Sequence, residues 1–325
     1  MILGLGVLFA AMALGQAPDT TAHTVQFVNV DTDVKLEVLD WSGSGRPLVM
    51  LAGLGNDAHV FDKFAPKLIG VYHVYGITRR GFGASSAPSP SGDETYSADR
   101  LGDDVLAVIE ALKLDRPVLA GHSIAGQELS SVGSRHPEKV AGLIYLDAGY
   151  GYAFYDRSHG NLNIDLTELQ GKLEQIKPGK STSDPRPLFS ELLDRLLPAF
   201  ERDLKEEQSF LDTLPPAMLA SASHMPAVSQ AIMAEGRKYT SIKAPILAIF
   251  AVPHDMGSAI NNDPILRARF EAHDLASTGA QAKAFEAGLP SARVVRLARA
   301  NHYVFRSNEA DVLREMKAFI DGLKN

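Results

Sequence analysis

The chain has 325 residues, of which 45% are hydrophobic and 22% charged, and its formal net charge is −7. This composition is that of a globular protein and excludes a disordered or fibrous chain. An acidic chain without a lysine or arginine cluster has no electrostatic reason to bind nucleic acid. Because there is no cysteine, a disulfide framework, a cysteine-bound metal and a thiol nucleophile are excluded together.

An apolar segment over residues 2–14 opens the chain, and small residues at Ala13, Gly15 and Ala17 offer cleavage sites. The segment is too short to span a bilayer but has the length of a signal-peptide core. We therefore predict a signal peptide over residues 1–17 and an exported protein, periplasmic or secreted, although no lysine or arginine precedes the apolar segment. Without a leader the protein would be cytoplasmic. No later segment has the length of a transmembrane helix, so no stable membrane span is expected.

Strand patterns alternate with helix patterns along the rest of the chain. Residues 24–30 and 34–40 are typical of a hairpin. Further apolar strand patterns lie at 48–52, 71–77, 117–120, 140–146, 245–251 and 293–297. Helix patterns lie at 60–68, at 99–112, after residue 123 and at the C-terminus, where Ser307 or Asn308 can cap the last helix. This alternation predicts an α/β fold with a mainly parallel, doubly wound sheet of about eight strands.

Residues 150–240 interrupt the alternation, because they contain helical patterns at 166–176 and 188–197 but no convincing strand. The segment is too long for a loop of a compact domain. It predicts a helical cap over 150–240, inserted after the sixth strand, with the α/β core formed by residues 18–149 and 241–325.

Ser123 is the candidate nucleophile. It follows the short strand at 117–120, where a second helix pattern begins, so its side chain would project from the sheet edge beside free backbone N–H groups. Such a turn needs small residues two before and two after the serine. Gly121 and Ala125 meet this need, with an alanine in place of the more usual second glycine, and Gly126 follows.

His302 is the candidate general base, because it lies just after the last strand, at 293–297. A loop at the carboxyl edge of a parallel sheet can bring a histidine to a serine at the same edge. A serine hydroxyl needs such a base before it becomes a useful nucleophile. The chain order serine, acid, histidine is also the order in which such a triad is expected in this arrangement.

Two aspartates compete for the role of the acid that orients the imidazole. Asp255 follows the strand at 245–251 and lies between Ser123 and His302 in the chain; Asp147 ends the strand after the nucleophile helix. We favour Asp255, because the end of that strand is the commoner acid position. It lies one residue late in its turn, which keeps Asp147 as the alternative.

Two backbone N–H groups are expected to form the oxyanion hole: that of Ile124, directly after the nucleophile, and that of Leu54, in the loop after the strand at 48–52. Gly53 and Gly55 flank Leu54 and let the backbone approach a substrate closely.

The other histidines near these motifs are interpreted as structural (His122, His59 and His73), and His254 as a pocket-lining or, preferably, a solvated loop histidine. No HExxH or comparable ligand set is present, so no metal and no cofactor are expected.

On these motifs the chain resembles the α/β-hydrolase superfamily, in its capped branch of serine esterases and lactonases, epoxide hydrolases and haloalkane dehalogenases. The resemblance rests on LVMLAGLGND (48–57), TRRGFGASSAP (78–88), PVLAGHSIAG (117–126), LIYLDAGY (143–150), PILAIFAVPHD (245–255) and ARANHYVF (298–305). It departs from the family at Ala52-Gly53, where His-Gly is usual before the oxyanion residue. Ser123 stands where the epoxide hydrolases and dehalogenases of this branch carry aspartate, which disfavours those two chemistries.

The resemblance implies a serine hydrolase that cleaves a small, apolar carboxylic ester or lactone through an acyl-enzyme. Two other functions stay open: cofactor-free lyase or perhydrolase chemistry on the same triad, and a ligand-binding protein with little turnover. The substrate would contact an apolar, partly aromatic lining under the cap, for which the candidates are Tyr150, Tyr152, Phe154, Tyr155, Met218, His224 and Met225.

Overall fold

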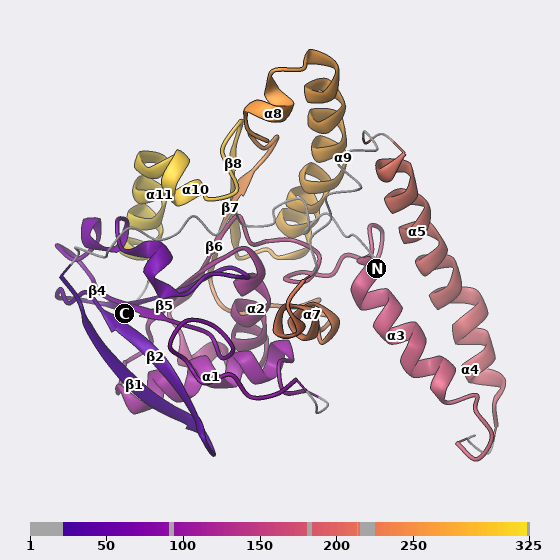
Figure 1. The fold of residues 1–325 in the computed structure, drawn as a ribbon, viewed down its shortest axis with the longest axis horizontal. Helices are drawn as coiled ribbons and strands as arrows, with labels where there is room; N and C mark the ends of the chain where they lie inside the picture. The colour runs from indigo at the N-terminus through magenta and orange to yellow at the C-terminus, as the bar shows by residue number, and fades with distance from the viewer. Residues whose placement is uncertain (1–21, 91–93, 181–183, 213, 215–224, 324–325) are drawn as a thin grey trace.

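The computed structural model describes residues 22–90, 94–180, 184–212, 214 and 225–323. One eight-stranded sheet runs through this part of the chain, in the order β1-β2-β4-β3-β5-β6-β7-β8 (Figure 1). The strands are β1 (Thr24–Asp31), β2 (Val34–Asp40), β3 (Pro47–Leu51), β4 (His73–Ile77), β5 (Val118–His122), β6 (Gly142–Leu146), β7 (Ile246–Ala251) and β8 (Ala292–Leu297). The predicted α/β fold and its strand positions are confirmed.

The pairing is parallel from β4 through β3, β5, β6 and β7 to β8, and antiparallel only where β1 joins β2 and β2 joins β4. Strands β5, β6 and β7 are buried at every residue, as their continuous apolar sequences require of a sheet covered on both faces. The carboxyl ends of these three strands therefore lie together at one edge of the sheet. Ser123 directly follows β5, Asp147 directly follows β6, and a loop follows Ala251 at the end of β7.

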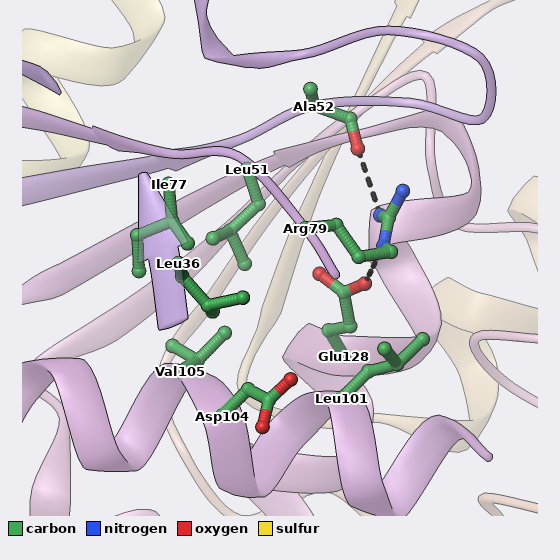
Figure 2. A pocket seen from close by; sticks show the side chains of 9 residues that line it. All are labelled: Leu36, Leu51, Ala52, Ile77, Arg79, Leu101, Asp104, Val105 and Glu128. Atoms are coloured by element: carbon green, nitrogen blue, oxygen red, sulfur yellow. Dashed lines mark hydrogen bonds and ion pairs between the residues drawn. The ribbon is translucent and has the colours of Figure 1, made fainter. Parts of the chain in front are cut away.

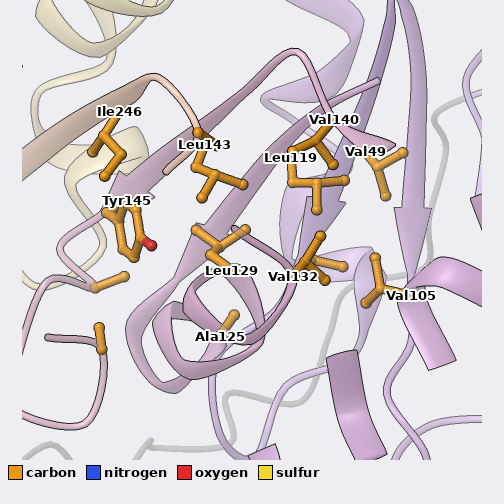
Figure 3. Packing of buried hydrophobic residues seen from close by; sticks show 14 of the residues in the cluster. Val49, Val105, Leu119, Ala125, Leu129, Val132, Val140, Leu143, Tyr145 and Ile246 are labelled. Carbon is orange, nitrogen blue, oxygen red and sulfur yellow. The ribbon is translucent and has the colours of Figure 1, made fainter. Parts of the chain in front are cut away.

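Successive residues of each strand pack against different helix layers. Val49 and Leu119 face α1 (Ala98–Ala111), α2 (Gly126–Arg135) and α9 (Pro264–Gly288), and Figure 3 shows part of this layer, with Leu129 and Val132 of α2 directed at the sheet. The neighbouring residues Leu48 and Met50 face the other layer, which includes α10 (Val304–Ser307) and α11 (Glu309–Asp321). The doubly wound arrangement follows directly from this alternation.

One local prediction needs correction, and two helices are found that the sequence analysis did not predict. The segment expected to be helical at 60–68 forms two 3₁₀ turns, η2 (Ala58–Phe61) and η3 (Ala65–Lys67), because Pro66 has no N–H to continue a helix through it. The long helix α9 and the short α8 (Ser258–Asn261) are not indicated by the sequence patterns. In α9 the buried face carries Asp274, Thr278 and Gln281 beside its apolar residues, which conceals the helical periodicity.

The segment between β6 and β7 is helical throughout its regular structure and has no strand among its described residues. It contains α3 (Leu162–Glu174), α4 (Arg186–Glu191), the π-helical turn η6 (Leu192–Leu196), α5 (Leu197–Leu211) and α7 (Ala227–Ala234). In Figure 1, α3 lies alongside α4 and α5 as an arm, and α7 lies between this arm and the sheet. The predicted helical cap after the sixth strand is confirmed; its division from the core at residues 149 and 240 stays a prediction.

The predicted signal peptide at 1–17 lies outside the described residues. Within the described part of the chain, no helix is long and apolar enough to cross a membrane.

Candidate active site

Ser123 lies between β5 and α2, as the first residue of the 3₁₀ turn η4 (Ser123–Ala125). Its φ of +54° is in the left-handed region, which a non-glycine residue adopts only when the surrounding structure holds it there. The turn is crowded: a Cβ on Gly121 would lie 3.1 Å from the Cβ of Ala125, and one on Gly126 would lie 2.0 Å from the carbonyl oxygen of Ala148. The small residues around Ser123 thus permit a sharp strand-to-helix turn that presents a half-buried serine hydroxyl.

His302 lies in the loop between β8 and α10, and its ring is held by a carboxylate at the end of β6. The distance from His302 Nδ1 to Asp147 Oδ2 is 2.6 Å, and the other oxygen of Asp147 accepts the Ala251 N–H at 2.9 Å. Asp147 is completely buried. Burial alone would raise the pKa of Asp147, but the charges and hydrogen bonds of His254 and His302 outweigh it and hold that pKa well below its ordinary value.

Asp255, the favoured acid of the sequence interpretation, is not brought to His302. Its side chain is exposed and accepts hydrogen bonds from the Gly257 N–H, at 2.9 Å, and from the Asn261 side-chain amide. The inward position of this turn belongs to His254, one residue earlier. Asp147, the alternative, is the carboxylate that the structure places on the imidazole.

His254 is buried, with 5% of its surface exposed, so the interpretation as a solvated loop histidine is wrong. Its Nε2 lies 2.8 Å from Asp147 Oδ2, and its Nδ1 lies 2.8 Å from Asp274 Oδ2. The Tyr150 hydroxyl also donates to Asp147 Oδ2, at 2.9 Å. One carboxylate oxygen therefore accepts hydrogen bonds from His302, His254 and Tyr150.

Asp147, His254 and His302 each offer one ligand atom, and these atoms lie within 4.8 Å of one another, which is also the composition of a metal site. The separations of 2.6 Å and 2.8 Å from Asp147 Oδ2 to the two ring nitrogens are those of direct hydrogen bonds. Ligand atoms that surround a zinc ion at ~2.0–2.1 Å lie roughly 3.3 Å apart. We therefore describe the three residues as a hydrogen-bonded cluster.

The loop predicted to carry the oxyanion hole lies against the nucleophile. A Cβ built on Gly53 would lie 3.1 Å from Ser123 Cβ and 2.8 Å from His122 Nδ1, so only glycine permits this approach. The loop is fixed by Asn56, whose side-chain amide donates to the Leu54 carbonyl at 3.2 Å. The N–H groups of Leu54 and Ile124 stay the predicted oxyanion donors.

Arg79, which follows β4, supports the same loop from behind. Its guanidinium donates to the Ala52 carbonyl at 2.8 Å and pairs with Glu128 of α2, as Figure 2 shows. Both side chains are buried. The cavity beside them is about 10 Å³, room for about one water molecule, and is not lined by Ser123 or His302.

The aromatic residues predicted to line the pocket divide into two groups. Tyr152 packs against the cluster that contains Ile124, directly after Ser123, and its ring lies 5.7 Å from that of Tyr150, so both tyrosines lie at the site. Phe154 instead packs against Phe285 in the core, and the Tyr155 hydroxyl donates to Asp165 of α3 at 2.7 Å.

Of the three remaining candidates for the lining, Met225 is the one among the described residues. Met225 precedes α7, where its carbonyl accepts the Gln230 side-chain amide at 2.6 Å. Met218 and His224 lie outside the described residues.

The three histidines interpreted as structural from the sequence make contacts that favour this role. His122 Nε2 lies 3.1 Å from the carbonyl oxygen of His302, His73 Nε2 lies 2.8 Å from Asp40, and His59 Nδ1 lies 3.0 Å from Asp62. The contact of His122 fixes the backbone of the loop that carries the candidate base.

A parallel sheet with a strained serine at a strand-to-helix turn and a carboxylate-bound histidine at the same edge defines a protein of the nucleophile-elbow α/β class. The model of the family described as alpha/beta hydrolase fold matches residues 46–308. The chain therefore belongs to the alpha/beta hydrolase fold family.

Several known proteins are similar to this chain. A fluoroacetate dehalogenase from Burkholderia sp. is 30% identical over 115 residues, which are 35% of this chain and 38% of the dehalogenase. A 2-(acetamidomethylene)succinate hydrolase from Mesorhizobium japonicum is 23% identical over 283 residues, covering 86% of this chain and 89% of that protein. The solved structure of an N-acyl homoserine lactone degrading enzyme has a TM-score of 0.53 at 23% identity, covering 90% of this chain and all of that one.

These similarities differ in what they establish. The match to the dehalogenase spans little more than a third of that protein's length. At 23% identity, the likeness to the lactone-degrading enzyme establishes the fold alone.

Proposed function

We propose that this protein is a serine hydrolase that cleaves a small, apolar carboxylic ester or lactone, with Ser123 as nucleophile, His302 as general base and Asp147 as the acid. The observation that carries the proposal is the buried, 2.6 Å contact between Asp147 and His302 at the sheet edge where Ser123 sits in a strained turn. This combination supplies an oriented base to a serine that cannot react without one.

In the proposed reaction, His302 Nε2 removes the proton of Ser123 while Oγ attacks the substrate carbonyl. The N–H groups of Leu54 and Ile124 stabilise the oxyanion. His302 then protonates the leaving alcohol, and an acyl-enzyme forms on Ser123. Water, deprotonated by His302, releases the acid and restores the serine.

The type of nucleophile supports acyl transfer. An ester of Ser123 is hydrolysed at its carbonyl carbon, whereas an alkyl ether formed on a serine by opening an epoxide or displacing a halide would not be. The names of two similar proteins, a 2-(acetamidomethylene)succinate hydrolase and an N-acyl homoserine lactone degrading enzyme, agree with hydrolytic chemistry on a carbonyl substrate.

An apolar cluster beside the site supports a small apolar substrate. Ile124, next to the nucleophile, packs in one cluster with Ile232 of α7, and Leu54, Tyr152 and Val228 contact that cluster. The cap thus presents aliphatic and aromatic side chains to both proposed oxyanion residues. Specificity for the acyl group would be set where α7 meets these residues.

Two further proposals rest on the sequence. The apolar residues 2–14 support export by a signal peptide over residues 1–17, and the helical content of residues 150–240 supports a cap domain with those bounds.

A panel of aryl esters, alkyl esters and lactones with increasing acyl length tests the proposed function. We expect turnover of short and medium acyl esters, with one acid and one alcohol released per substrate, measured by chromatography of the products. Cleavage of hydroxynitriles or formation of peracid without ester hydrolysis would indicate lyase or perhydrolase chemistry. Binding of esters without turnover would indicate a ligand-binding protein.

A further inference from the structure

His254 lies between two buried carboxylates. Its Nε2 contacts Asp147 Oδ2 and its Nδ1 contacts Asp274 Oδ2, both at 2.8 Å, and its own backbone N–H donates to the same Asp274 oxygen at 2.7 Å. Asp274 belongs to α9 and is 7% exposed. Two elements that are far apart in the chain thus hold this ring from opposite sides.

The contacts determine how many protons the ring carries. A neutral imidazole has one N–H and one acceptor nitrogen, but both nitrogens of His254 face carboxylate oxygens, which accept hydrogen bonds. Both contacts are favourable only when the ring is the doubly protonated imidazolium. Burial alone lowers the pKa of His254, but the charges and hydrogen bonds of Asp147 and Asp274 outweigh it and raise that pKa to about 10.

We propose that His254 is a positioning residue, a permanent cation that fixes Asp147 toward His302 and extends the activity of the enzyme to lower pH. The proposal rests on the proposed serine-hydrolase function and deepens it, because it adds His254 and Asp274 to the three residues of the triad. His254 transfers no proton in the reaction; it keeps both of its own while His302 exchanges one.

The shift in working range follows from charge. In a triad of three residues, the negative charge of the acid favours the protonated histidine. A protonated histidine cannot act as a base, so activity is lost in mild acid. Here the ring centroid of His254 lies 6.3 Å from that of His302, so a positive charge opposes a second one on the base. At this distance and a protein dielectric of ~20, the repulsion between two unit charges corresponds to a shift of about one to two pH units in the acid limb of the activity profile.

The groups that face His254 come from three other elements. They are Asp147 and Tyr150 after β6, Asp274 on α9, and His302 after β8. Burial and the charge of Asp147 raise the pKa of Tyr150 well above its ordinary value, so Tyr150 stays neutral and donates to Asp147. One cation therefore lies between two carboxylates and beside the proposed base His302.

The test is the pH profile of kcat/KM for His254→Gln, whose amide keeps one N–H donor without the charge. We expect the acid limb to move up by about one to two pH units. Turnover should therefore fall about tenfold or more at pH 5.5–6 and change much less at pH 8.5. A loss that is uniform at all pH values in a folded variant would overturn the proposal, because distortion alone has no reason to move the limb.

Two further variants make the direction of the shift informative. Asp274→Asn removes a negative charge and one of the two carboxylates that hold the second proton on His254, so its acid limb should move up less than that of His254→Gln, or move down. His136→Gln removes a partly exposed histidine at the C-terminal end of α2, far along the helix from Ser123, and should leave the pH profile unchanged. Equal upward shifts in His254→Gln and Asp274→Asn would contradict the proposed charge effect.

A spectroscopic measurement on the wild-type protein covers the case in which His254→Gln does not fold. In nitrogen-15 spectra of histidine side chains, His254 should show the doubly protonated pattern at pH 8, and a neutral pattern there would overturn the proposal. The failures are distinguishable: an unmoved acid limb in an enzyme that hydrolyses esters through Ser123 refutes only the role of His254. A wild-type protein without any ester turnover refutes the proposed function, whatever the spectra show.

Discussion

Replacing Ser123 with alanine is expected to reduce ester turnover by about 10⁴-fold or more, which is the usual cost of removing a triad nucleophile. The variant loses the only atom that forms the acyl-enzyme, while the proposed oxyanion donors, which are backbone groups, remain. Stability should change by less than about 0.5 kcal/mol, since the side chain is half-buried and small. The measurements are kcat on a chromogenic ester and thermal unfolding of both proteins.

The matched control for this variant is Ser134→Ala, near the C-terminal end of α2, the helix that follows the turn of Ser123. The Ser134 hydroxyl donates to the Ser241 carbonyl at 2.8 Å, away from His302, so turnover should be unaffected. If Ser123→Ala retained turnover close to that of the wild type, the proposed mechanism would be wrong.

Replacing Asp147 with asparagine is expected to lower kcat by about 10⁴-fold, because an amide can no longer stabilise the imidazolium of His302 or hold its tautomer. We expect this substitution to lower stability more than the loss of an ordinary triad acid does. The same oxygen accepts three hydrogen bonds, and a buried His254 would face an uncharged neighbour. The measurement is kcat at the pH optimum, with stability from denaturant unfolding.

Asp255→Asn is the control, because Asp255 is the competing acid on the same chain segment as His254. Among the described residues, its exposed carboxylate bonds Gly257 and Asn261 of α8, so kcat should change by less than about twofold and stability by less than about 1 kcal/mol. The opposite ranking of the two variants would return the role of the acid to Asp255.

Most of the fold was predictable, because the strands of a covered parallel sheet are continuous apolar runs bounded by turn residues. The buried strands β5, β6 and β7 each lie within one or two residues of their predicted bounds. Prediction failed where the local signal was ambiguous. Pro66 converts an apparently amphipathic helix into 3₁₀ turns, and α9 conceals its periodicity because it buries Asp274, Thr278 and Gln281.

The candidate site was predictable only where the backbone fixes it. Ser123, Gly53 and His302 lie at strand ends, and the alternation of elements places such ends at one edge of the sheet. The choice between Asp147 and Asp255 depends on which residue of the turn after β7 faces inward, and a difference of one residue decides it. His254 gave a weak signal through its place at that strand end, and its partner Asp274 gave none.

The most direct measurement of the central claim is covalent labelling with a fluorophosphonate, followed by mass spectrometry of the digested protein. The account predicts one phosphonyl group per chain, located on the peptide that contains Ser123, and no labelling of Ser123→Ala. Labelling should also be slow in Asp147→Asn, whose base is no longer oriented. A protein that stays unlabelled while folded, or that carries the label on another serine, would contradict the assignment of Ser123 and His302 as nucleophile and base.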